Sequence, residues 1–137
     1  MQRRAVRRLL PLVAVLTCAI ASACGDSTTA PITANAQLIG TYDLSSITFQ
    51  GQPSLAPPAA SGTLTLRDST YAVSLTVPPD TTAVTDSGTY TISGSSWTQS
   101  SKVQPVQSVG TYSFSNDTLT VNVTTLNMQV STVWKKR

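Results

Sequence analysis

From residue 38 onward, apolar and hydroxylated side chains alternate along the chain, with threonine or serine at nearly every second position. No segment of this part shows a helical period. Three segments begin with the same pattern of glycine, hydroxylated and apolar residues: 62–66, 88–92 and 110–114. A fourth, 40–44, opens the region. Alternation of this kind predicts strands with one buried and one solvated face, so we expect an all-β domain.

Each of the three later segments continues through a two-residue turn into a second alternating run. The turns centre on Asp68-Ser69, Gly94-Ser95 and Asn116-Asp117, residue types that suit tight hairpins. Such turns fix the register and place apolar opposite apolar residues in five of six pairs. The expected pairs are Leu66 with Tyr71, Leu64 with Val73, Ile92 with Trp97, Tyr90 with Gln99, Phe114 with Leu119 and Tyr112 with Val121.

A first strand at about residues 38–49, the three hairpins and a last strand at about 127–135 give eight consecutive strands. We expect a small antiparallel up-and-down meander that closes into a barrel, because closure hides the apolar face and removes exposed edges. A two-sheet β-sandwich is the alternative architecture.

The amino end has the three parts of a secretory signal. Arg3, Arg4, Arg7 and Arg8 precede an apolar stretch from Leu9 to Ile20, and small residues follow. The stretch is shorter than the ~20 apolar residues that a membrane-spanning helix needs. We therefore expect residues 1–23 to be removed on export.

The end of this signal resembles a bacterial lipobox, in which small residues precede an invariant cysteine. Ala21, Ser22 and Ala23 stand before Cys24. The resemblance implies acylation of Cys24, by palmitate among other chains, and attachment to a lipid bilayer. Gly25 favours the outer membrane of the cell envelope; Asp26 keeps the inner membrane as an alternative, and an ordinary cut after Ala23 would give secretion.

Removal of the signal changes the charge of the protein. The whole chain carries 9 basic and 6 acidic residues, a net charge of +3. Without the four signal arginines, five basic side chains oppose six acidic ones, and the net charge is −1. We therefore expect no nucleic-acid partner, since such a partner needs a basic face. Residues 24–37 are rich in Ser, Thr, Ala and Pro, and we interpret them as a flexible tether before the domain at 38–137.

The domain also resembles the lipocalin-like domains of bacterial lipoproteins. Their first strand carries Gly-x-Trp, and here Gly40-Thr41-Tyr42 stands in that place with tyrosine for tryptophan. The resemblance implies a barrel whose closed end has a basic residue over this ring. Lys135, Lys136 and Arg137, on or after the last strand, are the candidates.

The residues that catalysis commonly uses are scarce. The chain has no histidine and no glutamate, and Cys24 is assigned to the lipid. The six aspartates are scattered, and Asp80 to Asp86 is interpreted as a polar interstrand loop rather than a calcium loop. We expect a protein that is not an enzyme, with no cofactor and no metal.

Two roles from different classes remain. The first is binding of a small hydrophobic ligand inside the barrel, and the residues expected to line that site are Tyr42, Tyr90, Trp97, Gln99, Tyr112 and Trp134. Ser101 and Gln99, polar at inward positions, would orient the ligand. The alternative is that these aromatics fill the core, which the short strands favour. The second role is a structural one, in which the surface or the Gln50 to Ser61 connection contacts another envelope protein.

Overall fold

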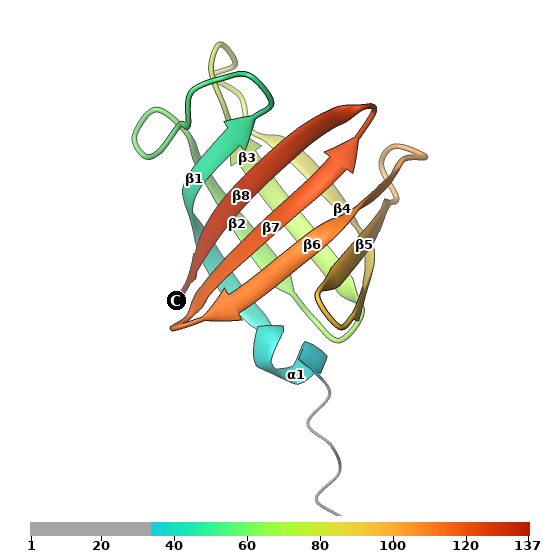
Figure 1. Cartoon of the computed structure of the whole chain (residues 1–137). Helices are drawn as coiled ribbons and strands as arrows, with labels where there is room; N and C mark the ends of the chain where they lie inside the picture. Colours follow the sequence, from blue (N-terminus) through green and yellow to red (C-terminus); the bar gives the residue numbers. More distant parts are fainter. Residues whose placement is uncertain (1–33) are drawn as a thin grey trace, which may run out of the picture.

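The computed structural model describes residues 34–137 and shows a closed barrel of eight antiparallel strands (Figure 1). Each strand pairs with the next along the chain, and β8 pairs with β1. The elements are α1 (Ala34–Leu38), β1 (Gly40–Phe49), β2 (Ser61–Leu66), β3 (Thr70–Thr76), β4 (Val84–Ser93), β5 (Ser96–Ser101), β6 (Gln107–Ser115), β7 (Thr118–Thr125) and β8 (Met128–Lys136). The predicted meander is confirmed, and the sandwich alternative is wrong.

The expected signal and the lipidation site at Cys24 lie outside the described residues, as does most of the expected tether. The described residues contain no helix that is long and apolar enough to cross a membrane.

All six predicted cross-strand pairs are present, so the hairpin registers are confirmed. In the β6–β7 turn, Asn116 and Asp117 have φ of 49° and 58°, and Gly94 in the β4–β5 turn has φ of 58°. These left-handed conformations suit Asn, Asp and Gly. The local turn residues thus set which side chains point into the barrel.

Two strand boundaries differ from the expectation. Leu38 belongs to α1 rather than to the first strand, which begins at Gly40. Strand β4 begins at Val84, four residues before the repeated segment that starts at Gly88. The interpretation of Asp86 as part of a polar loop is therefore wrong. Asp86 lies within a strand, at a position that shares its face with Tyr90, because residues two apart point the same way.

A β-bulge at Ser45 shifts the alternation within β1. Leu44 pairs with Trp134 of β8, and Ser46 pairs with the next residue back, so Ser45 has no partner of its own. Leu44 is buried on one side of the bulge and Ile47 on the other. The extra residue keeps apolar side chains inward along the whole strand and bends it around the barrel.

Glycines of the repeated segments allow neighbouring strands to approach closely. A Cβ on Gly88 would lie 1.9 Å from the carbonyl oxygen of Ser100, and one on Gly110 would lie 1.8 Å from that of Asn122. Across from them, Tyr71 pairs with Gly88 and Trp97 pairs with Gly110. Glycine at these positions permits the strong bending that a small barrel requires.

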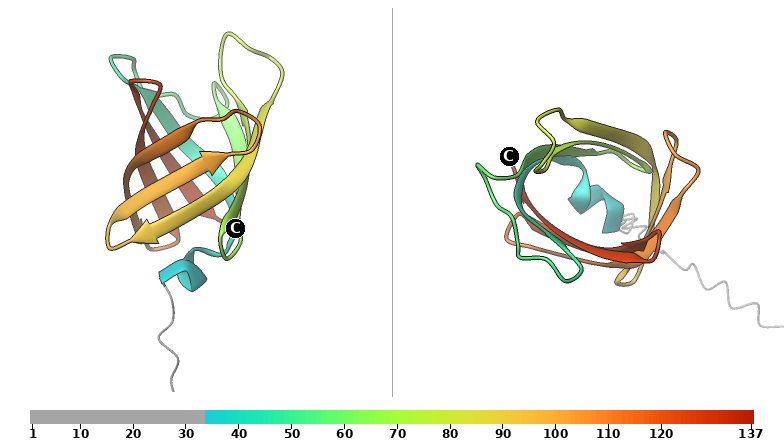
Figure 2. Two further views of the ribbon diagram at one scale, coloured as in Figure 1. Left: turned by 90° about the vertical axis from the view of Figure 1, so that its right-hand side faces the viewer. Right: turned by 90° about the horizontal axis from the view of Figure 1, so that it is seen from above.

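The two ends of the barrel differ. At the closed end lie the turns at 68–69, 94–95 and 116–117, and α1 sits across this end (Figure 2). Leu38 of α1 is 1% exposed and belongs to the core cluster. At the opposite, open end lie the connections at residues 50–60, 77–83, 102–106 and 126–127. Viewed from the open end, α1 is visible through the ring of strands (Figure 2).

Candidate ligand-binding cavity

A cavity of about 420 Å³ occupies the open half of the barrel. Its wall is mainly aliphatic and comes from strands around the ring. The aliphatic and phenyl side chains of the wall are Ile47, Phe49, Leu64, Val73, Leu75, Val77, Val121, Val123 and Val130. The expectation that side chains fill the whole interior is therefore wrong for this half. The volume falls within the ~300–1,000 Å³ typical of small-molecule sites.

Both tryptophans of the chain line this cavity and are buried. Trp97 Nε1 donates to Gln99 Oε1 at 2.9 Å, and Trp134 Nε1 donates to Thr132 Oγ1 at 2.8 Å. In both cases the acceptor lies two residues away on the same face of the same strand. Because their N–H groups are already paired, the indoles offer apolar surface to the interior.

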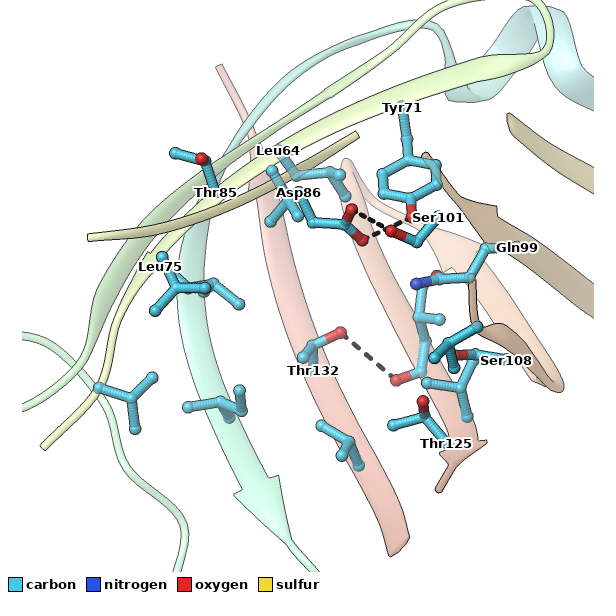
Figure 3. A pocket seen from close by; sticks show the side chains of 18 of the residues that line it. Leu64, Tyr71, Leu75, Thr85, Asp86, Gln99, Ser101, Ser108, Thr125 and Thr132 are labelled. Atoms are coloured by element: carbon cyan, nitrogen blue, oxygen red, sulfur yellow. Dashed lines mark hydrogen bonds between the residues drawn. The ribbon is translucent and has the colours of Figure 1, made fainter. Parts of the chain in front are cut away.

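A polar cluster interrupts the apolar wall where β3, β4 and β5 run side by side (Figure 3). Asp86 is at its centre. Tyr71 Oη donates to Asp86 Oδ2 at 2.7 Å, while Ser101 Oγ and the backbone N–H of Ser87 donate to Oδ1 at 2.5 and 2.8 Å. Burial raises the pKa of Tyr71, and its hydrogen bond to Asp86 acts in the same direction. Tyr71 therefore stays protonated and remains a donor.

Ser101 links this cluster to the connection between β5 and β6. Its hydroxyl oxygen accepts hydrogen bonds from the backbone N–H groups of Val103 and Gln104, at 3.1 and 3.0 Å. The same hydroxyl donates to Asp86. The position of the loop at the cavity mouth is thus tied to the carboxylate inside the barrel.

Gln99, Ser108 and Thr132 are further polar residues of the lining. Gln99 uses its carbonyl oxygen for Trp97, and its amide nitrogen points into the cavity (Figure 3). Thr132 Oγ1 donates to the Val121 carbonyl at 3.4 Å. Gln99 is therefore a neutral side chain whose amide donor faces the cavity (Figure 3).

The cavity lining does not provide a metal site. Among residues 36–137, whose side chains the structure describes, no three His, Cys, Asp or Glu side chains gather as a metal site. Asp80 and Asp86 are the acidic residues of the lining, and protein donors already occupy much of Asp86. The arrangement is a largely apolar cavity with two acidic residues in its lining.

The residues expected to bind ligand divide between the two halves. Trp97, Gln99 and Trp134 line the cavity, as does Ser101. The remaining three are Tyr42, Tyr90 and Tyr112, and none of them belongs to the lining. Tyr90 stacks on Trp97 with ring centroids 4.8 Å apart, so it packs behind the indole that lines the cavity.

Tyr42 is fully buried at the closed end and holds α1 in place. Its hydroxyl donates to the Leu38 carbonyl at 2.6 Å. Burial raises the pKa of Tyr42 to about 12, with smaller contributions from Tyr90 and Asp117. The hydroxyl is therefore a permanent donor at neutral pH, and the helix is fixed across the barrel end.

The expected cation over Tyr42 is Lys136. Its Nζ lies 5.8 Å from the centroid of the Tyr42 ring and 5.7 Å from that of Phe114. Its side chain passes over Gly40, where an added Cβ would lie 2.6 Å from the lysine Cε. In the Gly-x-Tyr motif, the glycine leaves room for the lysine side chain, and the tyrosine supplies the ring that the lysine covers.

Arg137 has a different role from Lys136. Its guanidinium forms a bidentate pair with the Asp43 carboxylate, with Nη2 to Oδ1 at 2.6 Å and Nε to Oδ2 at 2.9 Å. Hydrogen bonding to Arg137 holds the pKa of Asp43 below its ordinary value. Both side chains are more than half exposed, so this pair contributes little to stability.

Sequence reasoning missed Tyr71 and Asp86 as site residues. A signal was available for both. Asp86 continues the alternation of Tyr90 and Gly88 toward the amino end, and Tyr71 was already placed on the inward face by its pairing with Leu66. What the sequence does not show is that the two side chains meet, because they come from neighbouring strands at a diagonal offset.

The barrel is similar to two solved structures at low identity. One is described as the REP1-NXSQ fatty acid transporter, with 14% identity and a TM-score of 0.43, covering 74% of this chain and 97% of that one. The other is a mutant of the fluorescent protein UnaG, with 14% identity and a TM-score of 0.40, covering 74% and 96%. No protein-family model matches the chain. No curated protein sequence matches it either.

Proposed function

We propose that this protein is a non-catalytic binding protein that holds a small hydrophobic ligand in the open half of its barrel. The observation that carries the proposal is the cavity of about 420 Å³, which is lined by aliphatic side chains and by the indoles of Trp97 and Trp134. An empty apolar cavity forgoes packing contacts, and a ligand of matching shape would restore them.

The rim of the cavity supports entry from the open end. Val84 and Val103 line the mouth and are 62% and 61% exposed. Leu126, in the β7–β8 turn at the same end, is 75% exposed. Apolar residues that continue from the wall to the surface give a hydrophobic molecule a continuous path inward.

The proposal includes the location inferred from the sequence. With Cys24 acylated, the domain would be attached to an envelope membrane through residues 24–37, and the tether would enter at α1. The cavity opens at the other end of the barrel from α1, so α1 does not obstruct its mouth (Figure 1).

The test is tryptophan fluorescence of residues 24–137, titrated with decanol, an uncharged amphiphile. Because both tryptophans line the cavity, we expect a saturable change in intensity and emission maximum. Val123→Phe, which places a ring in the cavity, should abolish this change. Val109→Phe makes the same substitution at a 52% exposed position of the neighbouring strand and should leave it intact.

Thermal unfolding of each variant separates a blocked cavity from a misfolded barrel. Loss of binding in Val123→Phe with a Tm close to that of the unmodified chain supports the proposal. A fluorescence signal that does not respond to decanol in the unmodified chain, or that responds equally in Val123→Phe, would refute it.

A further inference from the structure

The charged groups of the cavity are all acidic. Asp80 and Asp86 are the ionisable carboxylic acids of the lining, and no lysine or arginine belongs to it. Four of the five basic residues of the described part of the chain lie at the closed end: Arg67, Lys135, Lys136 and Arg137. The fifth, Lys102, lies in the β5–β6 connection at the open end, next to Ser101, and does not belong to the lining. A ligand in the cavity would therefore meet negative charge without a compensating cation.

Asp86 accepts hydrogen bonds from three groups of the protein. The three groups that contact it are a phenol, a hydroxyl and a backbone N–H, and each of them donates. A carboxylate has about four acceptor positions, and three of them are used here. Asp86 lines the cavity, and its Oδ2 accepts from Tyr71 alone, so one acceptor position remains on that oxygen.

Within the described residues, no basic side chain forms a salt bridge with Asp86. The salt bridge within the described residues joins Arg137 to Asp43 at the closed end, away from the cavity. A carboxylate in a largely apolar cavity is costly unless donors or a cation satisfy it. Protein donors satisfy part of Asp86, and a ligand with a positive head would satisfy the rest.

We propose, building on the function proposed above, that the cavity prefers a cationic amphiphile: an apolar body with a protonated amine that pairs with Asp86. The amine would donate to Oδ2, next to the Tyr71 hydroxyl, while the apolar body lies against the valines and the two indoles. A carboxylate head would face the charge of Asp86 and is disfavoured. Gln99 could donate a hydrogen bond to a carboxylate ligand, but its amide is neutral and does not cancel the charge of Asp86.

The size of the preference follows from the interaction. A hydrogen bond to a charged group stabilises a complex enough to change affinity by about tenfold or more. The like-charge contact of a carboxylate ligand with Asp86 acts in the opposite direction. We therefore expect decylamine to bind at least about tenfold more tightly than decanoate, with decanol between them.

The experiment measures affinities of decylamine, decanol and decanoate by tryptophan fluorescence at neutral pH, with residues 24–137, at concentrations below micelle formation. The three probes share one alkyl chain and differ in the head group. Asp86→Asn keeps the shape of the side chain and removes the charge, so it should bring the three affinities to within about threefold. Asp117→Asn removes a charge at the closed end, where asparagine tolerates the left-handed backbone, and should leave the preference unchanged.

The outcomes separate this inference from the proposed function. If none of the probes binds, the proposed function fails and the inference with it. If decanol binds but decanoate binds as tightly as decylamine, the inference alone is overturned. A purely structural Asp86 would lower the Tm in Asp86→Asn without changing relative affinities, which also overturns it. If Asp86→Asn does not fold, the order of the three affinities in the unmodified chain still decides.

Discussion

The closed and open ends of the barrel are built by the same eight strands, but their inward side chains differ in size. At the closed end, Tyr42, Leu66, Tyr90 and Leu119 are at most 1% exposed and meet in the centre. At the open end, valine is the commonest residue of the cavity lining, with serine and threonine beside it, although Phe49, Tyr71 and the two tryptophans also contribute. An eight-stranded barrel is just wide enough for side chains to fill, so smaller ones leave a cavity.

Under the proposed function, this difference assigns stability to the closed end and ligand binding to the open end. The closed end buries large rings, pairs their polar atoms and adds a plug from α1. At the open end, the inward side chains border the cavity and have fewer packing contacts, and the Asp86 carboxylate is part of the cavity lining. A site for a ligand thus requires that one half of the barrel stabilises the other.

The largest expected effect comes from a matched pair of leucine truncations. Leu119→Ala removes a fully buried side chain at the closed end and should lower the free energy of unfolding by about 2–5 kcal/mol. Leu75→Ala should cost less than Leu119→Ala, because its side chain is only partly buried and borders the cavity. Urea unfolding measures both; equal losses would contradict the division.

The second effect is loss of stability at alkaline pH. The folded pKa of Tyr42 is about 12, above its ordinary value of 10.0. The neutral Tyr42 hydroxyl therefore contributes its full stabilisation below pH 10. This stabilisation is lost as the pH rises through 12, where Tyr42 ionises in the folded protein. This shift in the pKa of Tyr42 corresponds to a loss of roughly 2–3 kcal/mol in the free energy of unfolding at high pH.

Denaturant unfolding between pH 8 and 12 checks this, with Tyr42→Phe as the control. That variant loses the hydrogen bond to Leu38 at every pH but has no hydroxyl to ionise. Its stability should fall less steeply above pH 10. Some dependence would remain, since burial also raises the pKa values of Tyr71 and Tyr90. Identical slopes in both proteins would argue against the role of Tyr42.

The smallest effect concerns the cation at the closed end. Lys136→Met keeps an unbranched side chain over Gly40 but removes the charge above Tyr42 and Phe114, and it should cost about 0.5–1 kcal/mol. Lys135→Met removes a charge at the same end, where Nζ contacts the Asn116 carbonyl rather than a ring. Thermal unfolding at two salt concentrations compares them. A larger loss in Lys135→Met would contradict the assignment of the cation to Lys136.

Much of the candidate site could be placed from the sequence, but its members could not be brought together. Trp97, Gln99, Ser101 and Trp134 were expected to face inward, and they line the cavity. The closed-end tyrosines were grouped with them because the alternation shows which face a residue occupies and not how far along the barrel it lies. Asp86 was missed because threonines and prolines before Gly88 masked the start of β4.

The order of the strands, the two-residue turns and the registers of the three hairpins could be predicted from the sequence, although the starts of β1 and β4 could not. These depend on neighbours close in the chain: alternation sets the face, and Asn, Asp or Gly sets the turn. Closure of the barrel was also expected from the sequence. Only the folded structure shows that one end of the barrel is filled and the other hollow, and that Tyr71, Asp86 and Ser101 meet. Both depend on side chains from several strands at the same height, and that height is fixed only when all eight strands are paired.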